Sequence, residues 1–185
     1  MKHPSNQAFF AYWDEKRAAA RAPDRSEIEP EAVRELLPDI FVLSCLSASG
    51  YPFRVAGTRI CALLGCDLKD KSFSALFDAE SRRDIEDIIT VVTEEMLPAV
   101  AGITANSENA RSAHLELLLL PFNHRAHTPF SLTGLLAPFE AAHGVLRDFK
   151  LTSWRYLEQP APRLVPRALR KLKIARGLMV YEGLR

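Results

Sequence analysis

The sequence predicts an α+β fold in which helical segments come first and short strands are joined by tight turns. Near the start, aromatic residues recur at helical spacing. Further along, a nearly continuous apolar run over residues 40–46 and a second strand-like run over residues 51–56 flank the turn at residues 47–50. After a long helical stretch, three more strand-like runs are separated by polar turns. These observations together predict five strands, with helices before them and between them.

The first predicted helix has an aromatic face. Phe9, Phe10 and Trp13 recur at helical spacing, which predicts an amphipathic helix over residues 5–21 with Ser5 as its cap. Such a stripe must be covered by other apolar surface. Two covers remain open, the chain's own sheet and a second subunit, and we take the stripe as the self-association surface of a homodimer.

The other elements follow in a defined order along the chain. A second helix is expected over residues 26–38, because proline ends its apolar pattern. A hairpin with strands over residues 40–46 and 51–56 comes next, followed by a helical turn over residues 58–65 and a long helical region over residues 72–96. Three more strands are expected over residues 97–105, 112–122 and 129–138. The outer face of the long helical region is interpreted as a solvated surface, made of Arg82, Arg83, Asp84, Glu86, Asp87, Glu94 and Glu95.

The strand over residues 112–122 is expected to be covered on both faces. Alternation places Leu115, Leu117 and Leu119 on one face. The opposite face begins polar and becomes apolar, with His114, Glu116, Leu118 and Leu120. Part of the back of the sheet therefore needs a cover, and the aromatic stripe of the first helix is a candidate.

Composition predicts a folded cytoplasmic protein. The chain has 185 residues, of which 48% are hydrophobic, and no apolar run approaches the ~20 residues that a membrane-spanning helix requires. The first residues lack the pattern of an export signal. Three cysteines are an odd number, which favours reduced thiols that pack as small apolar side chains.

The formal charge is unevenly divided along the chain. Residues 1–158 hold 17 Lys+Arg and 22 Asp+Glu, a net charge of −5, whereas residues 159–185 hold 7 and 1, a net charge of +6. The tail is expected to form a basic amphipathic helix. Its cations are Arg163, Arg167, Arg170, Lys171, Lys173 and Arg176. The alternatives for its target are nucleic acid, an anionic membrane, an acidic partner, the chain's own acidic body and a second copy of the chain.

Three regions are expected on this basis. Residues 1–38 form an N-terminal helical extension, residues 39–140 form the core, and residues 141–185 form a C-terminal extension that carries the basic segment. After the last predicted strand too few residues follow for an output enzyme.

No pattern of catalytic residues is found. The GxSxG turn, the phosphate-binding loop and GxGxxG are absent from the sequence. His114, Glu116, His124 and His127 are the only concentration of metal-binding groups, and they lack a recognised spacing. We therefore predict neither catalysis nor a metal site, and no cofactor is identified. A metal bound by His114, Glu116 and His127 would favour an enzyme instead.

The runs FRVAGTRI, LLGCDL, KSF and HLELLLLPF, with WDEKR and IEPEAVRELLPDIFVL, resemble a PAS-like family of small stand-alone proteins in alphaproteobacteria. The resemblance covers roughly residues 9–140. It implies a five-stranded antiparallel sheet with helices on one face and a cavity between them. It also implies that Gly57 lets the strand turn into a helix, and that Arg54 and Arg59 bind loop backbone or acidic groups.

The resemblance further implies a sensory or regulatory protein that acts by binding a small ligand or a protein partner in a signalling pathway. A flavin photosensor is disfavoured, because the sequence around Cys61 does not match the reactive-cysteine motif. The alternative function is an adaptor that binds nucleic acid or a membrane surface through the tail. Ten residues are expected to line the pocket: Phe41, Leu43, Phe53, Val55, Ile60, Leu64, Phe73, Leu76, Leu117 and Leu119.

Overall fold

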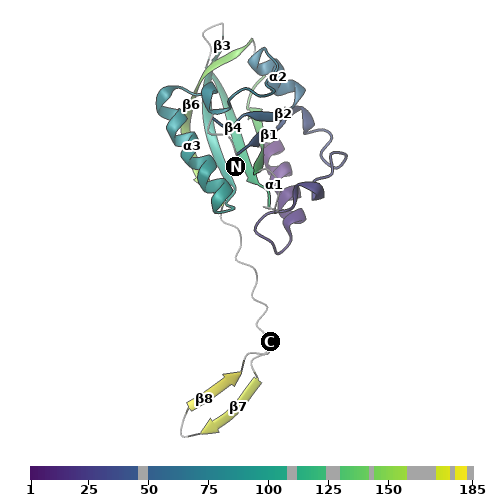
Figure 1. The fold of residues 1–185 in the computed structure, drawn as a ribbon, viewed down its shortest axis with the longest axis vertical. Coiled ribbons are helices and arrows are strands. Elements are labelled where there is room, and N and C mark those ends of the chain that lie inside the picture. The colour runs from purple at the N-terminus through teal and green to yellow at the C-terminus, as the bar shows by residue number, and fades with distance from the viewer. Residues whose placement is uncertain are drawn as a thin grey trace.

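The computed structural model describes residues 1–45, 50–107, 112–123, 130–141, 144–157, 170–175 and 178–182 (Figure 1). It has the predicted α+β fold. The helical elements are α1 (Pro4–Arg17), η1 (Arg25–Glu27), η2 (Leu37–Asp39), α2 (Thr58–Leu64), η3 (Ser74–Leu76) and α3 (Ala79–Glu94). The strands of the main sheet are β1 (Ile40–Ser44), β2 (Phe53–Ala56), β3 (Ala99–Ser107), β4 (Ser112–Pro121), β5 (Ser131–Pro138) and β6 (Leu146–Tyr156).

The main sheet has six strands in the order β2-β1-β5-β4-β3-β6, one strand more than predicted. All neighbouring pairs are antiparallel. The additional strand, β6, pairs with β3 and falls within residues 141–185, which were expected to lie outside the core. Because β6 is an edge strand with most of its residues exposed, it lacks the apolar alternation by which a strand is recognised in sequence.

The two faces of the sheet carry separate hydrophobic clusters. On the inner face, Leu115, Leu117 and Leu119 pack with α2, α3 and the segment between them. On the outer face, Leu118 and Leu120 pack against Phe9 and Trp13 of α1. The alternation predicted for residues 112–122 is thereby confirmed, and Figure 1 shows α1 and α3 at different sides of the sheet.

The aromatic stripe of α1 is covered by the chain's own sheet. The Phe9 and Trp13 side chains are fully buried, and the Trp13 Nε1–H donates a hydrogen bond of 3.0 Å to the Pro121 carbonyl. Phe10 is half-buried and stacks on Trp13. The prediction that Phe9, Phe10 and Trp13 form a self-association surface is therefore wrong for Phe9 and Trp13, because neither is exposed to a second subunit.

Several predicted helix bounds also differ. The segment expected to be helical over residues 26–38 consists of η1, successive turns and η2, with bonds from Ala32 N to Glu29 O and from Leu36 N to Val33 O. Pro30 explains the break, since a residue before proline is disfavoured in the helical region. The long region is split because Asp78 caps a new helix, α3, by accepting a bond from Ser81 N.

The C-terminal segment contains strands where a helix was predicted. β7 (Arg170–Ala175) and β8 (Leu178–Glu182) pair as an antiparallel hairpin. Its sequence mixes β-branched and aromatic residues with cations, a composition that also suits a strand. Of the six cations predicted to act in the tail, Arg163, Arg167 and Arg176 lie outside the described residues. Within the described ranges, no helix is both long and apolar enough to span a membrane.

Candidate functional site

A row of phenylalanine rings runs through the core between the sheet and the helices. Phe41, Phe53 and Phe73 contact one another, Phe73 contacts Phe77, and Phe77 contacts Phe149. The ring centroids of each contacting pair are 5.3 to 5.9 Å apart. All five side chains are at most 3% exposed. Offset and edge-to-face packing joins these rings into one continuous part of the buried core, in the region where the sequence predicted an internal cavity.

Most of the predicted pocket residues lie in this packed core. The buried set comprises Phe41, Leu43, Phe53, Ile60, Phe73, Leu117 and Leu119. Leu64 and Leu76 belong to the same cluster and also line a pocket that opens on the surface. Nine of the ten predicted residues therefore belong to one cluster, and of these only Leu64 and Leu76 line that pocket.

Val55 is the exception, because its side chain is 53% exposed. The register of β1 and β2 supplies the reason: Leu43 pairs with Phe53, whereas the adjacent Val42 pairs with Val55. Arg54 is therefore the extra residue of a β-bulge, which reverses the faces beyond it. Phe53 points into the core and Val55 does not, although simple alternation would place them together.

The pocket that Leu64 and Leu76 line, here called the seam pocket, lies where three segments meet. Its volume is about 670 Å³, and its walls come from the segment after α2, from η3 with the start of α3, and from the start of β6. Its apolar lining includes Phe77 and Phe149, the last two rings of the buried row. A ligand in the seam pocket would thus contact the end of the aromatic row directly.

The walls of the seam pocket are joined by hydrogen bonds from the backbone of one segment to the other. Asp78 N donates to Phe149 O at 3.1 Å, and Leu151 N donates to Ser81 Oγ at 3.0 Å. The Asp78 carboxylate also accepts a bond of 2.9 Å from Ser81 N, and the bonds from Ser81 lower the pKa of Asp78. Ser81 therefore connects the first turn of α3 to β6.

Charged side chains also line the seam pocket. Lys71, Arg82 and Arg147 contribute cations, and Asp78 and Asp148 contribute carboxylates. Arg82 was interpreted from the sequence as part of a solvated face, and β6 was not predicted at all. The pocket could not be assembled from the sequence for that reason, since one of its three walls comes from residues 146–149.

The strand-to-helix junction at Gly57 has the form that the family resemblance implied. A Cβ at this position would lie 2.2 Å from the Pro38 carbonyl oxygen, so no side chain fits there. One residue into α2, the Arg59 guanidinium pairs with the buried Asp39 carboxylate of η2. Burial raises the pKa of Asp39, and the Arg59 charge offsets part of that rise. This ion pair fixes α2 against the start of β1.

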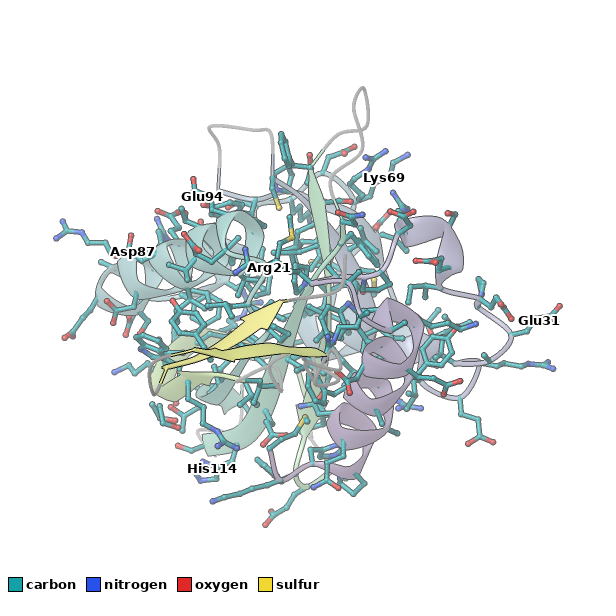
Figure 2. All side chains as sticks on the ribbon, turned by 90° about the horizontal axis from the view of Figure 1, so that it is seen from below. Arg21, Glu31, Lys69, Asp87, Glu94 and His114 are labelled. Carbon is teal, nitrogen blue, oxygen red and sulfur yellow. The ribbon has the colours of Figure 1, made fainter. Side chains whose placement is uncertain are left out.

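The histidines considered for a metal site do not gather in the described part of the chain. His114 is exposed, and Figure 2 shows it at the margin of the body, while His124 and His127 lie outside the described residues. Glu116 is buried and accepts bonds from the Lys2 and His3 amides and from Asn6 Nδ2, at 2.6, 2.9 and 3.0 Å. Burial by itself would raise the pKa of Glu116, but these bonds outweigh it and lower the pKa. Glu116 thus anchors the N-terminal segment to β4.

A second pocket of about 500 Å³ lies beside Glu116 on the outer face of the sheet. Gly102 of β3 is part of its lining, with Ser153 and Arg155 of β6. This outer pocket has no contact with the phenylalanine row, whereas the seam pocket ends on it. The seam pocket is therefore the stronger candidate for a site whose occupation changes the core.

The three cysteines lie in different surroundings. All three cysteines are free, and burial raises the pKa of Cys45 to about 12, which keeps it protonated at neutral pH. Cys61 is half-buried against the core, and Cys66 is exposed at the seam pocket.

Comparison with known proteins shows the family to which the chain belongs. A family model described as a PAS domain, PAS_5, matches residues 1–137, which is most of the chain. The chain belongs to the PAS domain family. The narrower resemblance, to stand-alone proteins of alphaproteobacteria, stays a prediction. Among curated proteins no match is found.

This PAS protein is also similar to solved structures of distant sequence. The light-state structure of the Aureochrome1 LOV photoreceptor is 9% identical, over 60% of this chain and 88% of that one, with a TM-score of 0.45. The PAS domain of an HTR-like protein from Haloarcula marismortui is 22% identical, over 59% and 88%, with a TM-score of 0.43. The LOV protein of Rhodobacter sphaeroides is 15% identical, over 58% and 66%, with a TM-score of 0.43.

Proposed function

We propose that this PAS protein is a non-catalytic regulatory protein of the cytoplasm, which binds a small ligand in the seam pocket and changes its contact with a protein partner accordingly. The observation that carries the proposal is the position of the pocket. It opens on Phe77 and Phe149, which are the end of the buried aromatic row. Its volume of about 670 Å³ lies in the range of pockets that hold small molecules.

The signal is proposed to leave through β6. A ligand that enters between η3 and β6 must separate or tighten two walls that are joined by Asp78, Phe149, Ser81 and Leu151. β6 is an edge strand, so its outer side is available for pairing with another chain. It also leads into the C-terminal segment. Ligand binding would therefore change the sheet edge to which a partner or a second copy of the chain binds. We still propose a homodimer, but with the β6 edge as its interface instead of the aromatic stripe of α1.

Filling the seam pocket should abolish ligand binding. Ala75 is exposed and lines the pocket, so Ala75→Trp is expected to occupy the space without disturbing the core. Native mass spectrometry of the freshly purified full chain should show a retained small molecule in the wild type and none in this variant. Ala62→Trp, at an exposed position of α2 outside the pocket, is the matched control and should retain the molecule.

The same mass spectra also report the number of subunits in the protein.

A molecule retained equally by Ala75→Trp and by the wild type would place the ligand elsewhere and contradict the proposed site. A wild-type chain that carries no molecule, and that gains no thermal stability from any of the compounds screened, would contradict ligand binding itself.

A second function, an adaptor that works through the basic segment, is favoured by the hairpin of β7 and β8. Residues 159–185 carry a net charge of +6. A two-stranded hairpin has only marginal stability in water without further packing, so a partner surface would stabilise it. Nucleic acid and an anionic membrane are the proposed partners. Within the chain itself, the acidic face of α3 is a competing binding surface for the basic segment, and Figure 2 shows Asp87 and Glu94 on that helix.

Deletion of residues 162–185 separates the two functions. If the adaptor function holds, the full chain should bind duplex DNA or anionic vesicles, and binding should fall steeply as salt is raised because phosphates release counterions. The truncated chain should then lose this binding and keep the ligand of the seam pocket. Full-length protein that binds neither at low salt would contradict the adaptor function.

A further inference from the structure

The seam pocket contains a guanidinium group that is held in place without a carboxylate partner among the described residues. Arg82 lies in the first turns of α3, where its Nε donates to Ser74 O and its Nη2 donates to Phe77 O, both at 3.2 Å. These two bonds fix the planar group against the pocket wall. Both acceptors are neutral carbonyls, so the positive charge is positioned but not neutralised.

The other charges of the pocket leave an excess of cation. Asp78 is already engaged, because it caps α3 through Ser81 N and lies 4.0 Å from Lys150 Nζ. Among the described residues, Asp148 is then the one carboxylate of the lining without a hydrogen bond or ion pair, whereas Lys71 and Arg82 supply two cations. Lys71 and Arg82 are exposed and have no ion pair among the described residues. An anionic group is the complement of this arrangement.

Most of the remaining lining is apolar and comes from all three walls of the pocket. Besides Ser72 and Cys66, it is formed by Leu64, Leu68, Ala75, Leu76, Phe77, Leu146 and Phe149. Such a surface favours a hydrocarbon or aromatic group, which loses water when it packs there. A ligand that satisfies both parts must therefore carry one anionic head and one apolar body.

We propose that the seam pocket binds an amphipathic carboxylic acid, with its carboxylate on Arg82 and its apolar body against Phe77 and Phe149. The inference rests on the proposed function, because it names the class of ligand for the same site. A carboxylate matches the guanidinium, since two parallel N–H···O bonds can form between the planar groups. A charge-assisted bond of this kind strengthens binding by about tenfold to a hundredfold relative to an uncharged head group.

Three probes of equal chain length test the class of ligand: decanoate, decanol and decylamine. Titration calorimetry on the full chain should give the tightest binding with decanoate, weaker binding with decanol and the weakest with decylamine. Arg82→Gln is expected to weaken decanoate by about tenfold or more, because it removes the charge, and to leave decanol almost unchanged. Arg82→Lys keeps the charge without the planar fork and should fall between them.

Arg83→Gln is the matched control. It removes the same charge from the adjacent, exposed position of α3, and Arg83 does not line the pocket. Decanoate should bind this variant as it binds the wild type, and a thermal melt of each variant checks that the fold is intact. Equal weakening by Arg82→Gln and Arg83→Gln would overturn the assignment of Arg82.

The failures of the two proposals can be told apart. Wild-type protein that binds decanol or decylamine as tightly as decanoate would overturn the acid preference and leave the seam pocket as the ligand site. The proposed ligand class and the proposed ligand site would both be overturned by a second result. In that result the wild-type protein binds none of the three probes, and it retains the same molecules as the Ala75→Trp variant.

Discussion

Trp13→Ala is expected to lower the free energy of unfolding by about 3–5 kcal/mol, which is the usual cost of removing a large aromatic side chain from a packed interior. Trp13 is 0% exposed and lies between α1 and the outer face of the sheet. The substitution also removes the donor to the Pro121 carbonyl. Urea unfolding followed by circular dichroism measures the change.

Two companion variants show which part of the Trp13 side chain matters. Trp13→Phe keeps most of the apolar contact and loses the hydrogen bond, so a loss of about 1–3 kcal/mol is expected. Phe10→Ala should cost less than Trp13→Ala, because Phe10 is only half-buried. If Trp13→Ala dissociated an oligomer and left the stability of each subunit unchanged, docking of α1 within its own chain would be contradicted.

The sequence predicted the parts of the fold in which apolar alternation is complete. β4 is the clearest case, because Leu115 to Leu120 alternate between two buried clusters, and both covers were expected. The prediction failed where alternation is interrupted or missing. The bulge at Arg54 reverses Val55, and no residue type near it signals that reversal. β6 exposes most of its side chains at the sheet edge, so its pattern resembles a polar loop.

The candidate site was predictable only in part, because its walls are far apart in the sequence. Leu64 and Leu76 were selected from local patterns, whereas Phe149 reaches the pocket through pairing of β6 with β3. Arg82 has the sequence context of a solvated helix residue. Its role follows from the carbonyls of Ser74 and Phe77, and these are placed by the break between η3 and α3 rather than by any motif.

Gly57→Ala is expected to destabilise the protein by about 3 kcal/mol, at the upper end of the usual cost of overpacking. The backbone dihedrals of Gly57, φ −65° and ψ 154°, are open to alanine, and alanine would by itself stabilise the chain slightly by restricting the unfolded state. The added Cβ would however lie 2.2 Å from Pro38 O, 2.3 Å from Leu37 O and 2.4 Å from Pro38 C. These are backbone atoms that cannot rotate away, so η2 must separate from α2.

Gly102→Ala is the matched control for Gly57→Ala. A Cβ at Gly102 would lie 2.9 Å from both Ser153 Oγ and Thr152 Oγ1, which are the ends of short side chains and can turn aside. Its cost should stay within about 0.5 kcal/mol, because alanine is also the better residue within a strand. The contrast tests whether η2 is held against Gly57, where Asp39 meets Arg59. If Gly57→Ala and Gly102→Ala lowered the urea midpoint equally, the backbone of η2 would move away from an added Cβ as easily as the side chains near Gly102 do. That result would contradict the prediction.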